Sequence, residues 1–439
     1  MNQELKDLAQ KTMDHALAQG ADQAAVSVSN ARFVDVKQRA GKVETLKASE
    51  SRGLSLALYA DGRFSSTNTS FLKWDEVRRF VDENLTLTRA LAPDKFRALP
   101  DPELYGPSEG ELDLCDPGFD DLDMDRRLEL VGAVEQAALG DGGDEVISAM
   151  AGMTSQAGSS LQLHSNGFRG ERAGTSFFLG ASVTASDDDG RRPEDYHWTA
   201  ARHLADLPDA ASIGAEANRR ALARRGAAKV PSGRMTLVVE NRAASRMVGS
   251  LLDPMSGLAL QQRRSCFDES LGQVIASEAL TITDEPLRPR GLGSRTFDGE
   301  GLAARPLPVV TAGRLDSYFI DVYYGRKLER PPTTGHTSNV VLAPGDGGLD
   351  ELLADVKRGI YVTSFLGGNA NPATGDFSFG VGGFLIEDGQ LGQPVGEMNI
   401  TDVHTSLWKR LHAVGNDPYP WSASQIPTLV FSDVQFSGM

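Results

Sequence analysis

The sequence predicts an α+β protein with two domains, an N-terminal α+β domain over 1–228 and a C-terminal, β-rich, barrel-like domain over 229–439. In the first half, segments with helical spacing of apolar residues flank segments that alternate like antiparallel hairpins. In the second half, short apolar segments separated by glycines follow one another closely, and one helix interrupts them. The length of 439 residues also exceeds what a single hydrophobic core usually organises.

The composition limits the classes of function. A formal net charge of −16 argues against sequence-independent binding to nucleic acid, which needs a basic face. Two cysteines support neither a disulfide framework nor a thiolate zinc site, and they suit a reducing compartment. The N-terminus has no apolar signal region, and no apolar segment is long enough to cross a membrane. We therefore expect a cytoplasmic protein.

In the N-terminal half, four helices are predicted, at 3–18, 73–91, 125–139 and 211–225. Alternating segments predict strands at 24–29 and 32–38, around 54–58, and in two hairpins that begin at 159 and 175. Residues 92–122 are rich in Pro, Gly and Asp, which is typical of a long surface connection. A second linker at 229–233 marks the expected domain boundary.

The C-terminal half opens with a buried strand at 237–239 that runs into a helix over 241–252. The polar side of this helix is expected to carry Asn241, Arg242, Ser245, Arg246 and Ser250. Further strands are predicted at 308–312, 317–323, 338–342, 359–366, 377–387 and 428–436, with one helix at 349–356.

A search for chemistry gives few candidates. No two histidines have the spacing of a zincin helix, and no nucleophile elbow, P-loop or C-x-x-C is present. Three groups remain as weak candidates for an acid, base or ligand: Asp376, His336 and Glu300. A Gly/Asn-rich segment could instead form the floor of a peptide cleft, through Gly367, Gly368, Asn369, Asn371, Thr374, Gly375 and Asp376. The alternative for this segment is a wide turn with positive φ at Gly and Asn.

Five segments, in chain order, resemble the TldD/PmbA family of bacterial proteases. They are SNG at 165–167, FDGEG at 297–301, TGH at 334–336, the block from TGDFS at 374–378 to EDG at 387–389, and VGND at 414–417. The resemblance implies an N-terminal α+β domain and a C-terminal barrel-like domain. It also implies a two-subunit cytoplasmic protease in which the TldD subunit binds zinc through H-E-x-x-x-H on a helix and a downstream cysteine.

Laid onto that pattern, the metal helix falls at 243–252. Ser245 and Ser250 stand where the two histidines would be, and Arg246 stands where the glutamate would be. A serine hydroxyl is a poor zinc ligand, and arginine cannot act as a base at neutral pH. Cys266 comes too early to be the cysteine ligand, so the resemblance is to the PmbA/TldE subunit. The family's A-G-N segment is also lost, at 401–403.

The leading hypothesis is therefore a non-catalytic subunit of a TldD/TldE-type heteromeric metalloprotease that acts on unfolded peptides or peptide precursors. No cofactor is expected in this chain, and zinc is expected in the TldD-type partner. Two alternatives stay open. One is a self-standing hydrolase with an unfamiliar site around Asp376 and His336. The other is a scaffold that self-associates and binds peptides without cleaving them.

Overall fold

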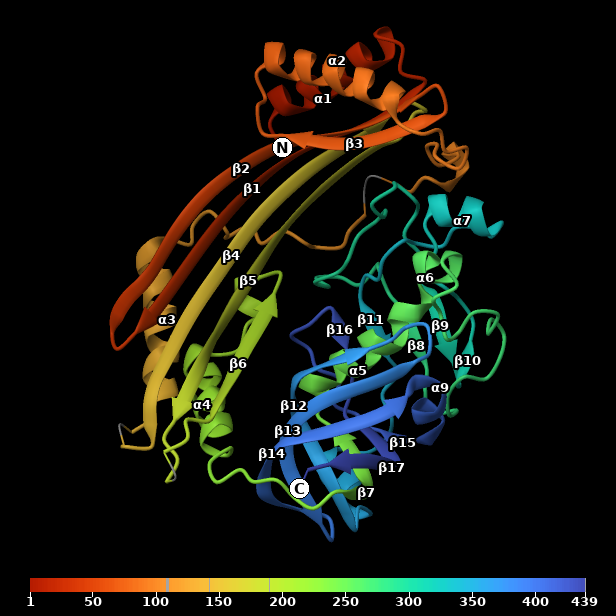
Figure 1. Cartoon of the computed structure of the whole chain (residues 1–439). Helices are drawn as coiled ribbons and strands as arrows, with labels where there is room; N and C mark the ends of the chain where they lie inside the picture. The colour runs from red at the N-terminus through yellow and green to blue at the C-terminus, as the bar shows by residue number, and fades with distance from the viewer. Residues whose placement is uncertain (108–109, 142, 189, 439) are drawn as a thin grey trace.

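The computed structural model describes residues 1–107, 110–141, 143–188 and 190–438. It is an α+β structure, as the sequence predicts. A long, curved antiparallel sheet forms the N-terminal half and arches over a C-terminal half built around a barrel (Figure 1). No helix among the described residues is long and apolar enough to cross a membrane.

The N-terminal sheet has six strands in the order β3-β2-β1-β4-β5-β6. The strands are β1 (Gln23–Arg39), β2 (Lys42–Ala60), β3 (Arg63–Thr69), β4 (Val146–His164), β5 (Arg169–Ala185) and β6 (Glu194–Ala201). The predicted strands at 24–29 and 32–38 are one strand, because Asn30 and Ala31 continue the pairing with β2 and β4 without a break. Cross-strand pairing thus overrides the local interruption of the apolar pattern.

Four helices cover one face of this sheet: α1 (Gln3–Ala18), α2 (Trp74–Ala90), α3 (Met124–Leu139) and α4 (Ala210–Leu222). All four lie where the sequence predicts helices. Val26, Val28 and Val36 of β1 have the same parity, so they point to the same face. The first two pack under α1 and α2, and Val36 packs under α3 and α4. The opposite face is therefore left to look toward the C-terminal half.

The predicted connection at 92–122, of which residues 108 and 109 lie outside the described part, contains one short 3-10 helix at Pro102–Leu104. It does more than cross the surface, because its backbone bonds to both halves. On the side of the N-terminal half, the backbone N–H of Thr175 donates to the Leu114 carbonyl oxygen at 2.9 Å. On the side of the C-terminal half, the backbone N–H of Gly106 donates to the Gly301 carbonyl oxygen at 2.9 Å.

In the C-terminal half, five strands close into a barrel: β7 (Gly233–Val239), β12 (Arg358–Ala370), β13 (Asp376–Glu387), β14 (Gln390–Val403) and β17 (Leu429–Ser437). Closure comes from the pairing of β14 with β17 at Ile400 and Phe436. Beside β17 lies β15 (Leu411–Val414). A separate sheet contains β8 (Ile282–Asp284), β9 (Leu307–Thr311), β10 (Arg314–Leu315), β11 (Val340–Leu342) and β16 (Ser424–Gln425).

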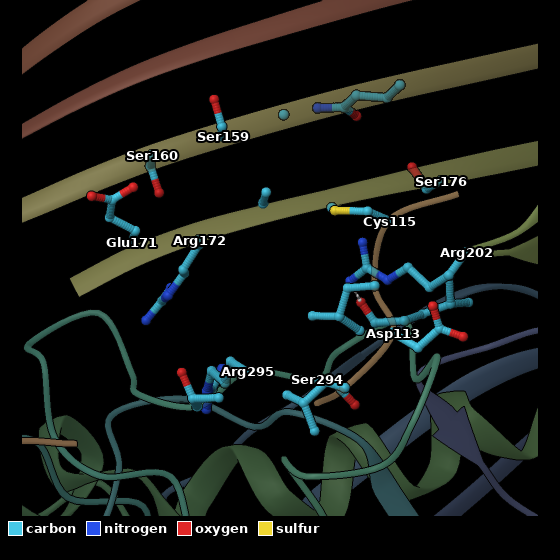
Figure 2. A pocket seen from close by; sticks show the side chains of 18 of the residues that line it. Asp113, Cys115, Ser159, Ser160, Glu171, Arg172, Ser176, Arg202, Ser294 and Arg295 are labelled. Atoms are coloured by element: carbon cyan, nitrogen blue, oxygen red, sulfur yellow. Dashed lines mark hydrogen bonds between the residues drawn. The ribbon is translucent and has the colours of Figure 1, made fainter. Parts of the chain in front are cut away.

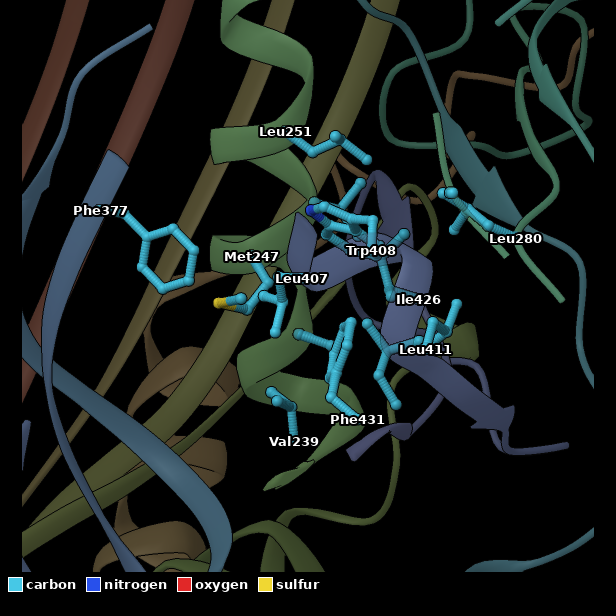
Figure 3. Close-up of a cluster of buried hydrophobic side chains, with 14 of the residues drawn as sticks. Val239, Met247, Leu251, Leu280, Phe377, Leu407, Trp408, Leu411, Ile426 and Phe431 are labelled. Carbon is cyan, nitrogen blue, oxygen red and sulfur yellow. The ribbon is translucent and has the colours of Figure 1, made fainter. Parts of the chain in front are cut away.

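Helix α5 (Asn241–Leu252) follows β7 directly and supplies part of the barrel core. Met247 and Leu251 are fully buried and belong to the same hydrophobic cluster as Trp408 and Phe431 (Figure 3). The predicted strand-to-helix unit and its apolar stripe are thus confirmed.

The remaining helices are α6 (Gly257–Gln261), α7 (Val322–Leu328), α8 (Leu349–Ala354) and α9 (His404–Leu407). The helix predicted at 349–356 is therefore present, but it is not alone. The strand predicted at 317–323 is wrong, because α7 begins inside it. Asp321 caps α7 by accepting a hydrogen bond from the backbone N–H of Tyr324 at 2.6 Å, and this cap outweighs the strand propensity of the tyrosines.

A buried group of charged side chains joins the two halves. Arg220 of α4 binds Glu240 with two hydrogen bonds, of 2.7 and 2.6 Å. Arg242 of α5 pairs with Asp195 of β6 at 3.1 Å and donates to the Tyr196 carbonyl oxygen at 2.7 Å. Burial alone would lower the pKa of Arg220, yet Glu240 and Asp195 raise that pKa above its usual range. We call these four charged residues the junction cluster.

Glu240→Gln removes the charge that pairs with the buried Arg220 guanidinium. We expect the free energy of unfolding to fall by about 3 kcal/mol, because a buried charge loses its partner. Urea denaturation measures this loss. Asp433→Asn is the matched control, since its ion pair with Arg234 is exposed, and little change is expected there. Equal effects of the two substitutions would contradict the importance of the junction cluster.

Candidate functional site

The three positions that the resemblance assigns to a metal helix lie on α5 but do not face one another as ligands. Ser245 is half-buried, and Arg246 is exposed. The Arg246 guanidinium lies over the ring of Phe379 at 5.1 Å, and its Nη2 reaches the Gly368 carbonyl oxygen at 3.5 Å. Arg246 thus lies against the turn end of the β12–β13 hairpin.

Ser250 is buried and hydrogen-bonded to a histidine that is 154 residues away. Its Oγ lies 2.8 Å from Nε2 of His404, and the indole Nε1 of Trp408 lies 3.0 Å from Nδ1 of the same ring. The prediction that Ser250 belongs to a polar face is therefore wrong, because an internal partner satisfies its hydroxyl. Arg242 also turns inward, to the junction cluster.

The network assigns the tautomer of His404. An indole nitrogen can only donate, so Nδ1 of His404 must accept, and the ring proton must be on Nε2. That proton is donated to Ser250 Oγ. Burial lowers the pKa of His404 to about 4, so the ring is neutral at pH 7. Because Nε2 carries the proton, His404 cannot take one from Ser250, and the pair is no serine–histidine dyad.

The side chains present do not suit zinc. Ser250 is engaged with His404, Arg246 is a cation, and Ser245 offers a hydroxyl that binds zinc poorly. Within the described ranges, no three His, Cys, Asp or Glu side chains come together as a set that could hold a metal ion.

The segment at 401–403, which replaces the family's A-G-N, leads directly into His404. Asp402 Oδ1 accepts hydrogen bonds from the backbone N–H of Val403 at 2.8 Å and from Ser406 Oγ at 3.0 Å. The backbone N–H of His404 donates to the Gly375 carbonyl oxygen at 2.9 Å. The segment at 401–403 thus leads into the residue that is hydrogen-bonded to Ser250.

The Gly/Asn-rich segment is partly strand and partly turn. Residues 367–370 belong to β12, and the chain turns over 371–375 before β13 begins at Asp376. Gly367, Gly368 and Gly375 have positive φ, but the two asparagines do not. At Gly368 a Cβ would lie 2.1 Å from the Ser378 carbonyl oxygen, so only glycine allows this pairing. Gly367, Gly368, Asn369, Asn371, Thr374 and Asp376 are exposed, and Gly375 is buried.

Asp376, His336 and Glu300 are not brought together. No hydrogen bond or ion pair joins any two of them within the described part of the chain, and His336 and Asp376 are exposed. Glu300 accepts a hydrogen bond from the backbone N–H of Val322 at 2.8 Å, at the start of α7. Burial raises the pKa of Glu300 to about 7, which that hydrogen bond partly offsets.

A cavity of about 820 Å³ lies between the C-terminal half and the uncovered face of the N-terminal sheet (Figure 2). We call it the arch pocket. Its walls are the free end of β5, the 110–115 segment and the loop 292–296, and its cationic side chains are Arg172, Arg202 and Arg295. Sequence reasoning missed these residues. They are far apart in the chain and carry no motif, and only the curvature of the sheet brings them together.

Comparison with known families identifies the class to which this fold belongs. Models of the PmbA/TldA metallopeptidase match in chain order: domain 1 over 24–88, the central domain over 117–225 and the C-terminal domain over 232–438. The chain therefore belongs to the TldD/PmbA family. The first two matches fall inside 1–228 and the third inside 229–439, and the boundary at 228/229 stays a prediction.

Individual relatives cover nearly the whole chain. The metalloprotease PmbA of Escherichia coli is 28% identical over 428 residues, which are 96% of this chain and 94% of that protein. A crystal structure from Bacteroides thetaiotaomicron, whose name proposes a modulator of DNA gyrase, has a TM-score of 0.97 at 39% identity and covers 100% of both chains. TldE from Thermococcus kodakarensis has a TM-score of 0.86 at 18% identity, with 98% and 100% covered, and shows the same fold.

The buried histidines make stability depend on pH. In the unfolded chain His404 takes up a proton near its ordinary pKa of 6.5, whereas in the folded chain it does so only near 4. The free energy of unfolding therefore falls as the pH drops from 6.5 toward 4, by about 1.4 kcal/mol per pH unit for this residue. Burial also lowers the pKa of His164 to about 4, so this residue makes a similar contribution to the pH dependence of stability.

We expect the free energy of unfolding of His404→Gln to fall less steeply with decreasing pH, because one histidine no longer takes up a proton on unfolding. Urea denaturation at several pH values between 7.5 and 4.5 measures this. His336→Gln is the matched control, because the His336 side chain is exposed. An unchanged slope in His404→Gln would contradict the assignment of a neutral, buried imidazole.

Proposed function

We propose that this chain is the non-catalytic, TldE/PmbA-type subunit of a heteromeric TldD-type metalloprotease, with zinc in the TldD-type partner. The observation that carries the proposal is α5, where Ser245, Arg246 and Ser250 occupy the positions of the family's metal motif. The Ser250 hydroxyl is hydrogen-bonded to His404 at 2.8 Å, so it connects α5 to the segment that contains His404. The family membership supports a role in proteolysis, and the chemistry of this helix supports the non-catalytic assignment.

The substrates that suit this subunit are unfolded peptides. An extended peptide can add to a free strand edge through main-chain hydrogen bonds, which need no particular side-chain motif. The free end of β5 beside the arch pocket is one such edge, and the turn at 371–375, where Asn371, Ala373 and Thr374 are exposed, is a second surface for contact. We propose a cytoplasmic location, because Cys115 and Cys266 are both free and suit a reducing compartment.

Co-expression with the TldD homologue of the same genome tests the proposal. We expect the two chains to co-purify, zinc to follow the partner, and casein or peptide cleavage to require both chains and to be lost with a zinc chelator. The matched control is a partner whose H-E-x-x-x-H histidines are replaced by alanine, which should still co-purify but not cleave. Chelator-sensitive cleavage by this chain alone would show that the proposal is wrong.

A further inference from the structure

The arch pocket has an unusual charge balance for a chain with a net charge of −16. Arg172, Arg202 and Arg295 form no ion pair with a carboxylate in the described part of the structure. They bond instead to backbone carbonyl oxygens and, for Arg295, also to the Thr334 hydroxyl. The junction cluster is the opposite case, since both of its guanidinium groups are paired with carboxylates.

The acidic residues at the pocket are already neutralised elsewhere. Glu171 pairs with Lys6 of α1 at 2.7 Å, on the helix-covered side of the sheet. Asp113 pairs with Arg290 at 2.6 Å and lies 3.2 Å from the imidazole of His203. These carboxylates are therefore not available to balance Arg172 and Arg295.

Arg172 and Arg295 keep unused donors. Arg172 extends from β5 into the pocket above Arg295 (Figure 2), and the Nε atoms of both residues are buried with no hydrogen-bond partner among the described residues. Burial and, to a lesser extent, the neighbouring Arg295 lower the pKa of Arg172 to about 10, and Asp298 opposes this shift. Buried donors on two neighbouring cations favour an anion between them.

The backbone of β5 offers a second contact. β6 pairs only with residues 177–184 of β5, so the segment 169–174 has no strand on that side. The Thr175 N–H points to Leu114 on this edge, and antiparallel alternation puts the N–H groups of Ala173 and Glu171 on the same edge. A chain lying there would carry every second side chain on the face from which Arg172 projects.

We propose that the arch pocket binds a carboxylate carried by an extended peptide, with Arg172 and Arg295 holding the carboxylate while the peptide backbone pairs with β5 at Glu171 and Ala173. The identity of the carrier rests on the proposed function in peptide proteolysis. The carboxylate is either the end of the peptide chain or an acidic side chain, since both present the same two oxygens to a guanidinium.

Calorimetric titration of the full chain tests the proposal with short acetylated peptides of one otherwise uncharged sequence. The peptides carry an internal glutamate or glutamine and a free or amidated carboxyl end. We expect a carboxylate-bearing peptide to bind about tenfold more tightly than the amidated glutamine peptide, as one charge-assisted hydrogen bond allows. Loss of affinity on amidation identifies the chain end as the ligand, and loss on exchange of glutamate for glutamine identifies the side chain.

Arg172→Gln and Arg295→Gln are expected to remove this discrimination, whereas Arg172→Lys retains part of it. Arg78→Gln, at an exposed position of α2, is the control with the same change in net charge and should bind like the wild type. Thermal midpoints establish that each variant is folded, and Arg295→Gln replaces Arg172→Gln if the latter is not.

Equal affinity for charged and uncharged peptides, or an equal loss in Arg78→Gln, would overturn the carboxylate site while leaving peptide binding intact. Absence of binding to every peptide would overturn it as well. The co-purification and casein assays decide the role of the subunit separately, so the failure of one proposal is distinguishable from the failure of the other.

Discussion

The two ion pairs buried between α4, β6 and the start of α5 hold the arched sheet at one position against the barrel. Arg220 and Arg242 come from different halves of the chain, and so do Glu240 and Asp195. Removing a charge from water is costly. Each of these four side chains is therefore stable in its buried position only while the oppositely charged residue stays beside it. The free end of β5 faces the loop 292–296 across the arch pocket, and hydrogen bonds from Arg172 to Phe297 and from Arg202 to Gly291 add to this contact between the halves.

Burial has different consequences for charge in different parts of the molecule. In the junction cluster, carboxylates and guanidiniums neutralise each other: even the Nε atoms of Arg220 and Arg242, which make no hydrogen bond among the described residues, lie 3.7 and 3.5 Å from carboxylate oxygens. In the arch pocket, guanidiniums are tied to carbonyl oxygens, which orient them without cancelling their charge. The first arrangement fixes the shape of the protein, and the second keeps binding capacity in a place where water is partly excluded.

Much of the fold can be predicted from the sequence, because helices and hairpins depend on local periodicity. The apolar stripe of α5 and the four N-terminal helices are examples. The length of β1 could not be predicted, since Asn30 and Ala31 continue the strand only through pairing with β2 and β4. The start of α7 could not be predicted either. The tyrosines there are compatible with a strand or a helix, and the cap formed by Asp321 favours the helix.

The site is less accessible to sequence reasoning. The three positions that the resemblance assigns to a metal helix, at 245, 246 and 250, are visible in the sequence. Their structural meaning is not, because His404 lies 154 residues from Ser250 and follows the segment that departs from the family pattern. The three arginines of the arch pocket are likewise separated by long stretches of chain, and nothing in their local surroundings marks them.

The hydrogen bond between Ser250 and His404 bears on any attempt to design the H-E-x-x-x-H motif into α5. Placing histidines at 245 and 250 and a glutamate at 246 would write that motif onto α5, but the histidine at 250 would bring a second imidazole against the ring of His404. The His404 ring accepts a hydrogen bond from the Trp408 indole and packs at a tilt against Phe377, with ring centroids 4.8 Å apart. Because the helix and the barrel residues that face it are packed together in this way, a redesign would have to change both surfaces at once.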